Sequence, residues 1–227
     1  MIMVFHREEF VVAAGYTIVD PNDPKGVLGK TIAQWTQDWW TWEIQSPANK
    51  NAVDDKTGKY ANVGNDQSGS GVFFIGGTRS GDATRTFTVP YGDALLVPVI
   101  NYFDTADPKN LENHLVNNFI AGVDVTKLSA TIDGNPIANL SQYLETSGFF
   151  SMGTIRPNTV ATELFGNDLI GLPLTPTKAT GYYLMIEGLS LGEHTLEFGG
   201  SSQGDSAGVK PFSTHVVDHI TVVMPPA

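Results

Sequence analysis

Glu43 is a carboxylate that the sequence places among apolar residues rather than on a polar face. The stretch QWTQDWWTWE, residues 34–43, holds all 4 tryptophans of the 227-residue chain. On a helical wheel Glu43 falls between two apolar stripes. A carboxyl group there is either paired with a cation or raised in pKa by desolvation, and a general acid needs the raised pKa. The plainer explanation is a structural ion pair or an exposed rim position.

Arg85 is the cation that we expect to pair with Glu43. The run TRTFTVP, residues 84–90, alternates polar and apolar residues as a strand does, and Arg85 shares its face with Phe87 and Val89. An arginine that points into apolar surroundings needs a carboxylate partner. Arg79 is the alternative partner.

The tryptophans themselves predict a helix that is apolar on two sides. Thr31 is a suitable N-cap and Pro47 stops the pattern after Ser46. One stripe is expected to be buried, and the other either packs against a second layer or offers Trp40 to a ligand or partner. The first stripe comprises Ile32, Trp35, Trp39 and Trp42, and the second comprises Ala33, Trp40 and Ile44.

Weaker patterns suggest further binding sites. Tyr182, like Trp40, is a candidate platform on which a sugar ring stacks. Asp54, Asp55 and Asp66 lie in a polar loop that is a possible calcium site, although the loop lacks EF-hand spacing. His215 and His219 would stand about 13 Å apart on a strand, which is too far for one metal ion.

The rest of the chain predicts a mainly β protein. Short apolar or alternating runs are separated by glycine-rich turns, without a βαβ rhythm. We expect an antiparallel β-sandwich or jelly roll with one N-terminal aromatic helix and a second short helix over residues 111–121. LSATIDGNPIANL predicts a hairpin that turns near Asp133 and Gly134. Residues 1–30 are expected to form an extension, 31–227 a single domain, and the segment 147–180 a surface wrap.

Composition narrows the classes of partner. The formal net charge of −11 disfavours binding to nucleic acid or to an anionic membrane surface. No apolar run approaches the roughly 18 residues of a membrane span, so we expect no membrane insertion. The N-terminal residues lack the order of a signal peptide. The chain has no cysteine, which excludes disulfides and thiolate chemistry.

Four blocks together resemble a family of bacterial, mostly exported proteins with no assigned reaction. The blocks are WWTWE, VFFIGGTRSGDATRTFTVPYGDALLVPVIN, LSATIDG and GYYLMIEGLSLGEHTLEFGGSS. The resemblance implies a β-rich protein located outside the cytoplasm, in the periplasm or beyond the cell. Family members often carry cysteines where this chain has Tyr60 and Phe87, so the disulfide that they would form is absent here.

The sequence therefore favours a non-catalytic exported protein that acts by binding, or by assembly into homo-oligomers or fibres at the cell surface. Its ligand would be a neutral polar molecule such as a glycan, bound with Trp40, Glu43, Arg85 and Tyr182. No cofactor other than calcium is suggested. The alternative is a carbohydrate-active enzyme in which Glu43 and a second carboxylate form the catalytic pair. A metal enzyme of the cupin type would need three converging ligands, which strand parity does not suggest.

Overall fold

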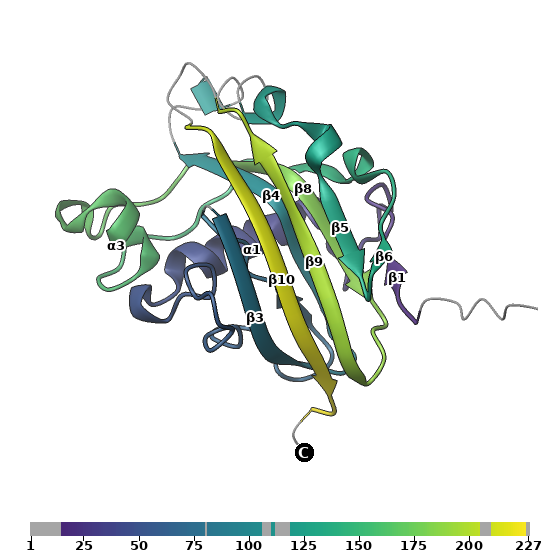
Figure 1. Cartoon of the computed structure of the whole chain (residues 1–227). Coiled ribbons are helices and arrows are strands. Elements are labelled where there is room, and N and C mark those ends of the chain that lie inside the picture. Colours follow the sequence, from purple (N-terminus) through teal and green to yellow (C-terminus); the bar gives the residue numbers. More distant parts are fainter. Residues whose placement is uncertain (1–14, 80, 106–109, 112–118, 205–209, 226–227) are drawn as a thin grey trace, which may run out of the picture.

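Two five-stranded β-sheets pack face to face (Figure 1). The computed structural model describes residues 15–79, 81–105, 110–111, 119–204 and 210–225. The first sheet has the order β1 (Thr17–Ile18), β8 (Thr177–Glu187), β4 (Ala94–Thr105) and β2 (Val72–Phe74), and β7 (Leu144–Thr146) also pairs with β8. The second has the order β3 (Gly81–Pro90), β10 (Phe212–Val223), β9 (Gly192–Ser202), β5 (Ser129–Ile132) and β6 (Asn135–Pro136).

The predicted mainly β sandwich is confirmed, but its sheets are mixed rather than purely antiparallel. β2 runs parallel to β4, and β3 runs parallel to β10 along its whole length. The other strand pairs are antiparallel. Side-chain alternation predicts a strand and its buried face, but it carries no information about the direction of a partner that lies far away in the sequence.

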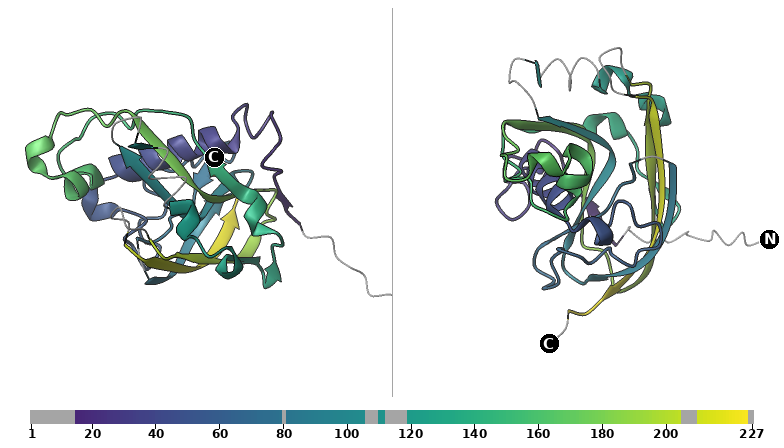
Figure 2. Two further views of the ribbon diagram at one scale, coloured as in Figure 1. Left: turned by 90° about the horizontal axis from the view of Figure 1, so that it is seen from above. Right: turned by 90° about the vertical axis from the view of Figure 1, so that its left-hand side faces the viewer.

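The aromatic helix covers the outer face of the first sheet, which gives the molecule a third layer (Figure 2). Helix α1 (Ile32–Gln45) begins after the expected N-cap Thr31, whose side chain forms a reciprocal capping box with Gln34. Its last residue is Gln45, and the C-cap Ser46 directly precedes Pro47. Both ends of this helix were therefore predictable from local sequence.

A second short helix, α3 (Val160–Phe165), packs beside α1. Of the helix expected over residues 111–121, residues 112–118 lie outside the described residues. The segment 147–180 was expected to wrap the surface, but it contributes Met152, Val160 and Leu174 to the core around α1. Single-turn helices complete the fold: η1 (Ala48–Lys50), η3 (Val125–Lys127), η4 (Leu140–Tyr143) and η5 (Asn167–Leu169).

The core is divided by the first sheet into two apolar clusters. One cluster fills the space between the sheets, and the other lies between the first sheet and α1. The first seven residues of β4 are therefore buried on both faces, as their continuous apolar run predicts. The expected N-terminal extension is partly structural, because Thr17 and Ile18 pair with β8.

Candidate functional site

Helix α1 turns Trp39, Trp40 and Glu43 toward the first sheet. Trp39 and Ile44 are buried as core residues, and Trp40 is 9% exposed. Trp35 and Trp42 were expected in the buried stripe but are only half-buried. Every indole N–H has an acceptor, and that of Trp40 donates to the hydroxyl of Tyr183 at 3.0 Å. These bonds fix the rotation of the helix and thus the position of Glu43.

The carboxyl group of Glu43 is buried, with 3% of the residue exposed. Its Oε1 accepts a hydrogen bond from Asn51 Nδ2 at 3.0 Å, whereas Oε2 has no partner among the described residues. Burial raises the pKa of Glu43 to about 7, against the opposing effects of Asn51 and Arg79. Glu43 is thus both paired and raised in pKa, the two conditions that its sequence position suggested.

Arg79, rather than Arg85, is the arginine that faces Glu43. Its Nη2 lies 3.7 Å from Glu43 Oε1, 3.1 Å from Asp54 Oδ2 and 3.9 Å from Glu163 Oε2. The three carboxylates come from α1, from the loop after η1 and from α3. Arg79 therefore joins three separate elements while its own side chain is 37% exposed.

The predicted ion pair between Arg85 and Glu43 is wrong, because Arg85 faces Asp218 of β10 at 3.7 Å. Arg85 also donates hydrogen bonds to the carbonyl oxygens of Asp55, Gly76 and Gly77. Asp218 is 0% exposed, and burial raises its pKa to about 7 even though the Arg85 charge acts to lower it. The parallel pairing of β3 with β10 brings the two residues together. Asp218 was not predicted from the sequence; its alternation with Val216 and Ile220 was the available signal for an inward face.

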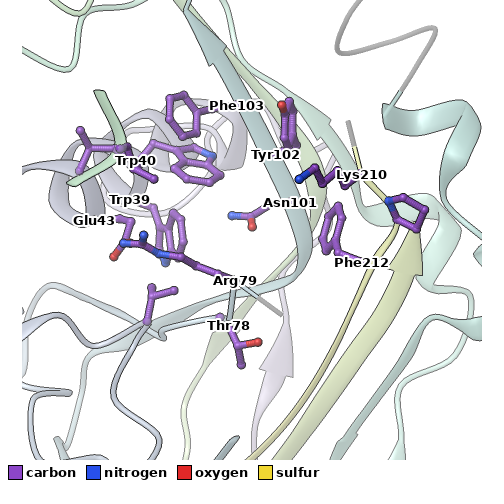
Figure 3. Close-up of a pocket in the computed structure, with 15 residues that line it drawn as sticks. Trp39, Trp40, Glu43, Thr78, Arg79, Asn101, Tyr102, Phe103, Lys210 and Phe212 are labelled. Atoms are coloured by element: carbon purple, nitrogen blue, oxygen red, sulfur yellow. The ribbon is translucent and has the colours of Figure 1, made fainter. Parts of the chain in front are cut away.

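A pocket of about 430 Å³ opens beside Glu43 and Trp40. Figure 3 shows Trp40 and Phe103 on one side of Asn101, with Tyr102 and Phe212 on the other. Three consecutive residues of β4, from Asn101 to Phe103, line this pocket. Because successive side chains of a strand point to opposite faces, the pocket extends around the edge of β4 and reaches both faces of the sheet.

The side chain of Asn101 lies at the base of this pocket. Its Nδ2 donates to the hydroxyl of Tyr183 at 3.0 Å. Gly181 stands opposite on β8, where a Cβ would come within 2.6 Å of the Cα and Cβ of Asn101. Asn101, Phe103 and Phe212 were not predicted from the sequence. A polar residue that ends the buried run LLVPVIN was the available signal for Asn101.

Tyr182 is not part of this pocket. It is 3% exposed and belongs to the cluster between the sheets, where burial raises its pKa. Its neighbour Tyr183 points to the α1 side instead. The expected stacking platform at Tyr182 is therefore wrong, because strand parity turns that ring into the core.

The acidic residues of the expected calcium loop have separate roles. Asp54 faces Arg79, Asp55 accepts from the backbone of Thr57, and Asp66 accepts from Ser68. Across the described ranges no three His, Asp or Glu side chains converge as they would around a metal ion. His215 instead lies 2.9 Å from Glu197 on the outer face of the second sheet.

Comparison with protein-family models, with curated proteins and with solved structures gave no match. None of the helices in the described part of the chain is long and apolar enough to cross a membrane.

Proposed function

We propose that the protein is a non-catalytic binding protein that holds a small molecule in the pocket between α1, β4 and the start of β10. One observation carries the proposal: Trp40 and Glu43, the two residues that a purely structural helix leaves unexplained, line the same pocket of about 430 Å³. A concave site with mostly apolar walls and a few polar groups is the usual form of a small-molecule site.

The enzyme alternative has less support from the same geometry. Its best argument is the raised pKa of Glu43, with Asp54 sharing the Arg79 guanidinium. A general acid, however, must approach the reacting oxygen to within hydrogen-bond distance. Oε1 of Glu43 is engaged by Asn51, and Oε2 is sealed from solvent. Catalysis by Glu43 would need Arg79 and its neighbours to rearrange first.

Assembly through strand addition also has less support than binding. The long outer strand β3 has a turn packed against the middle of its free edge, where Thr86 N–H donates to the carbonyl oxygen of Thr57 at 3.0 Å. An edge that is already occupied offers little to a strand from a second molecule. We propose an exported location on the resemblance alone.

Pocket binding can be tested with a matched pair of substitutions at exposed leucines. Leu164 lies on α3 at the pocket and is 45% exposed, whereas Leu191, which is 51% exposed, lies in the turn before β9. A library of small neutral, anionic and cationic molecules is screened by saturation-transfer NMR against the wild-type chain. Leu164→Trp should abolish the signals of the hits by filling the pocket mouth, and Leu191→Trp should leave them intact. Hits that are insensitive to Leu164→Trp, or no hits, would contradict the proposal.

A further inference from the structure

The pocket has the shape of a slot between two aromatic walls. Trp40 and Phe103 form the first wall, with ring centroids 4.5 Å apart and ring planes tilted by 50°. The second wall is a stack in which Tyr102 lies on Phe119 at 5.4 Å and Phe119 on Phe212 at 6.0 Å. The ring planes of this stack are nearly parallel, at 21° and 12°, and Phe119, which is 0% exposed, lies between the two rings that line the pocket. We call the space between the walls the ring slot, because a ring bound there would have aromatic side chains on both sides.

The charges around the ring slot disfavour an ionic ligand. An anion would have to compete for Arg79 with the carboxylates of Glu43, Asp54 and Glu163, all within 4 Å of its Nη2. A cation would meet Arg79 and Lys210, which both line the pocket. Either charge would also lose its hydration between apolar walls. An uncharged ligand avoids all three costs.

The base of the slot offers hydrogen bonds to hydroxyl groups. The amide of Asn101 is oriented by its bond to Tyr183, whose hydroxyl also receives the indole N–H of Trp40. With Nδ2 engaged there, Oδ1 of Asn101 is left to accept from a ligand. The guanidinium of Arg79 supplies donors at the same pocket. A hydroxyl group both donates and accepts, so a ligand with two or more hydroxyls matches both residues.

We propose that the ring slot binds an uncharged, hydroxylated ring, which contacts Trp40 and Phe103 on one side and Tyr102 and Phe212 on the other, with its hydroxyl groups at Asn101 and Arg79. This inference rests on the proposed binding function and names the chemical class of the ligand. The ring is either a sugar or a phenol, since both combine an apolar face with a hydroxylated edge.

The test uses probes of similar size and shape that differ in charge. In the phenolic arm, 3,5-dihydroxybenzamide is compared with the 3,5-dihydroxybenzoate anion and the 3,5-dihydroxybenzylammonium cation. In the sugar arm, methyl glucoside is compared with methyl glucuronide, its anionic counterpart. Affinities are measured by titration calorimetry at pH 7 on the full chain. We expect the neutral member of at least one arm to bind about tenfold or more tightly than its charged counterparts.

Variants locate this binding in the slot. Asn101→Ala and Phe103→Leu should each weaken the neutral probe about tenfold, because they remove a hydrogen bond and part of a wall. His215→Ala, on the outer face of the second sheet, should leave the affinity unchanged. If Asn101→Ala fails to fold, Leu164→Trp can be used instead. It should also weaken binding of the neutral probe, and it leaves Asn101 in place.

The outcomes separate this inference from the proposed function. Equal or tighter binding of a charged probe, blocked by Leu164→Trp, would overturn the ligand class and leave small-molecule binding in place. If no neutral probe binds, the proposed ligand class is also overturned. The library screen with Leu164→Trp then decides independently whether the pocket binds a small molecule. The arm that binds identifies the ring as a sugar or a phenol.

Discussion

At the scale of single residues, the buried carboxyl of Glu43 makes stability depend on pH. Its pKa is raised from 4.5 to about 7, so the folded state holds this proton more tightly than the unfolded chain does. The contribution of Glu43 to the free energy of unfolding therefore falls as the pH rises from about 4.5 to about 7. Asp218 and Glu145, whose pKa values burial also raises to about 7, add to the same trend.

Glu43→Gln should remove the part of this pH dependence that is due to Glu43. The amide keeps an acceptor for Asn51 and has no charge to desolvate. Between pH 5 and pH 8 the free energy of unfolding should therefore fall by about 3 kcal/mol less in the variant than in the wild type. Urea unfolding at the two pH values measures the difference. Glu193→Gln, an exposed position on β9, is the control and should keep the wild-type dependence. An equal slope in Glu43→Gln and wild type would mean that Glu43 is ionised throughout.

The sequence predicted the apolar surroundings of Glu43 correctly, but it did not identify Arg79 as the arginine that faces Glu43. The helical wheel placed Glu43 between apolar stripes because both the helix and its caps are local features. The choice between Arg79 and Arg85 depended on which strand lies opposite Arg85. That strand, β10, follows more than a hundred residues later, beyond the reach of any periodicity.

At the scale of elements, Arg85 holds the loops that frame the pocket. One guanidinium on β3 bonds the backbone of Asp55 in one loop and of Gly76 and Gly77 in another, and faces Asp218 on β10. The first loop carries Val53 and Asp54, and the second carries Thr78 and Arg79.

Arg85→Met should destabilise the protein by about 3 to 5 kcal/mol, because it leaves Asp218 buried without a counter-charge. The double variant Arg85→Met, Asp218→Leu removes both charges and should recover part of this loss. Chemical unfolding of the single and double variants measures both values. The expectation fails if the double variant is no more stable than Arg85→Met alone.

Elements with local signals were predictable, and those defined by distant contacts were not. The hairpin at Asp133 and Gly134 is present, and their φ values of 53° and 75° are those that a two-residue hairpin turn of this kind requires. The face of β3 that carries Phe87 was also predicted correctly. The ring slot was not, because its walls come from α1, β4 and β10, which meet only in the folded chain.

At the scale of the whole molecule, the covered edge of β3 bears on self-association. Gly58 has a φ of +90°, and a Cβ at this position would lie 2.5 Å from the carbonyl oxygen of Thr86. Gly58→Ala should therefore move the turn away from β3 and expose the strand edge.

We expect Gly58→Ala to raise the fraction of dimers and larger species, measured by sedimentation velocity. Gly171→Ala is a matched control, because Gly171 has the same φ of +90° but open space around its Cβ position. Identical sedimentation of the two variants would show that the turn does not protect the edge.

The central place of β10 has a consequence for how the chain is made. This strand lies between β3 and β9, so residues 212–223 join two parts of the second sheet that do not otherwise pair. A ribosome releases the chain from its N-terminus, and until β10 emerges the second sheet cannot close. The edges of β3 and β9 that β10 covers therefore stay unpaired until residues 212–223 have been synthesised, and a chaperone that binds unpaired strands has that interval in which to act.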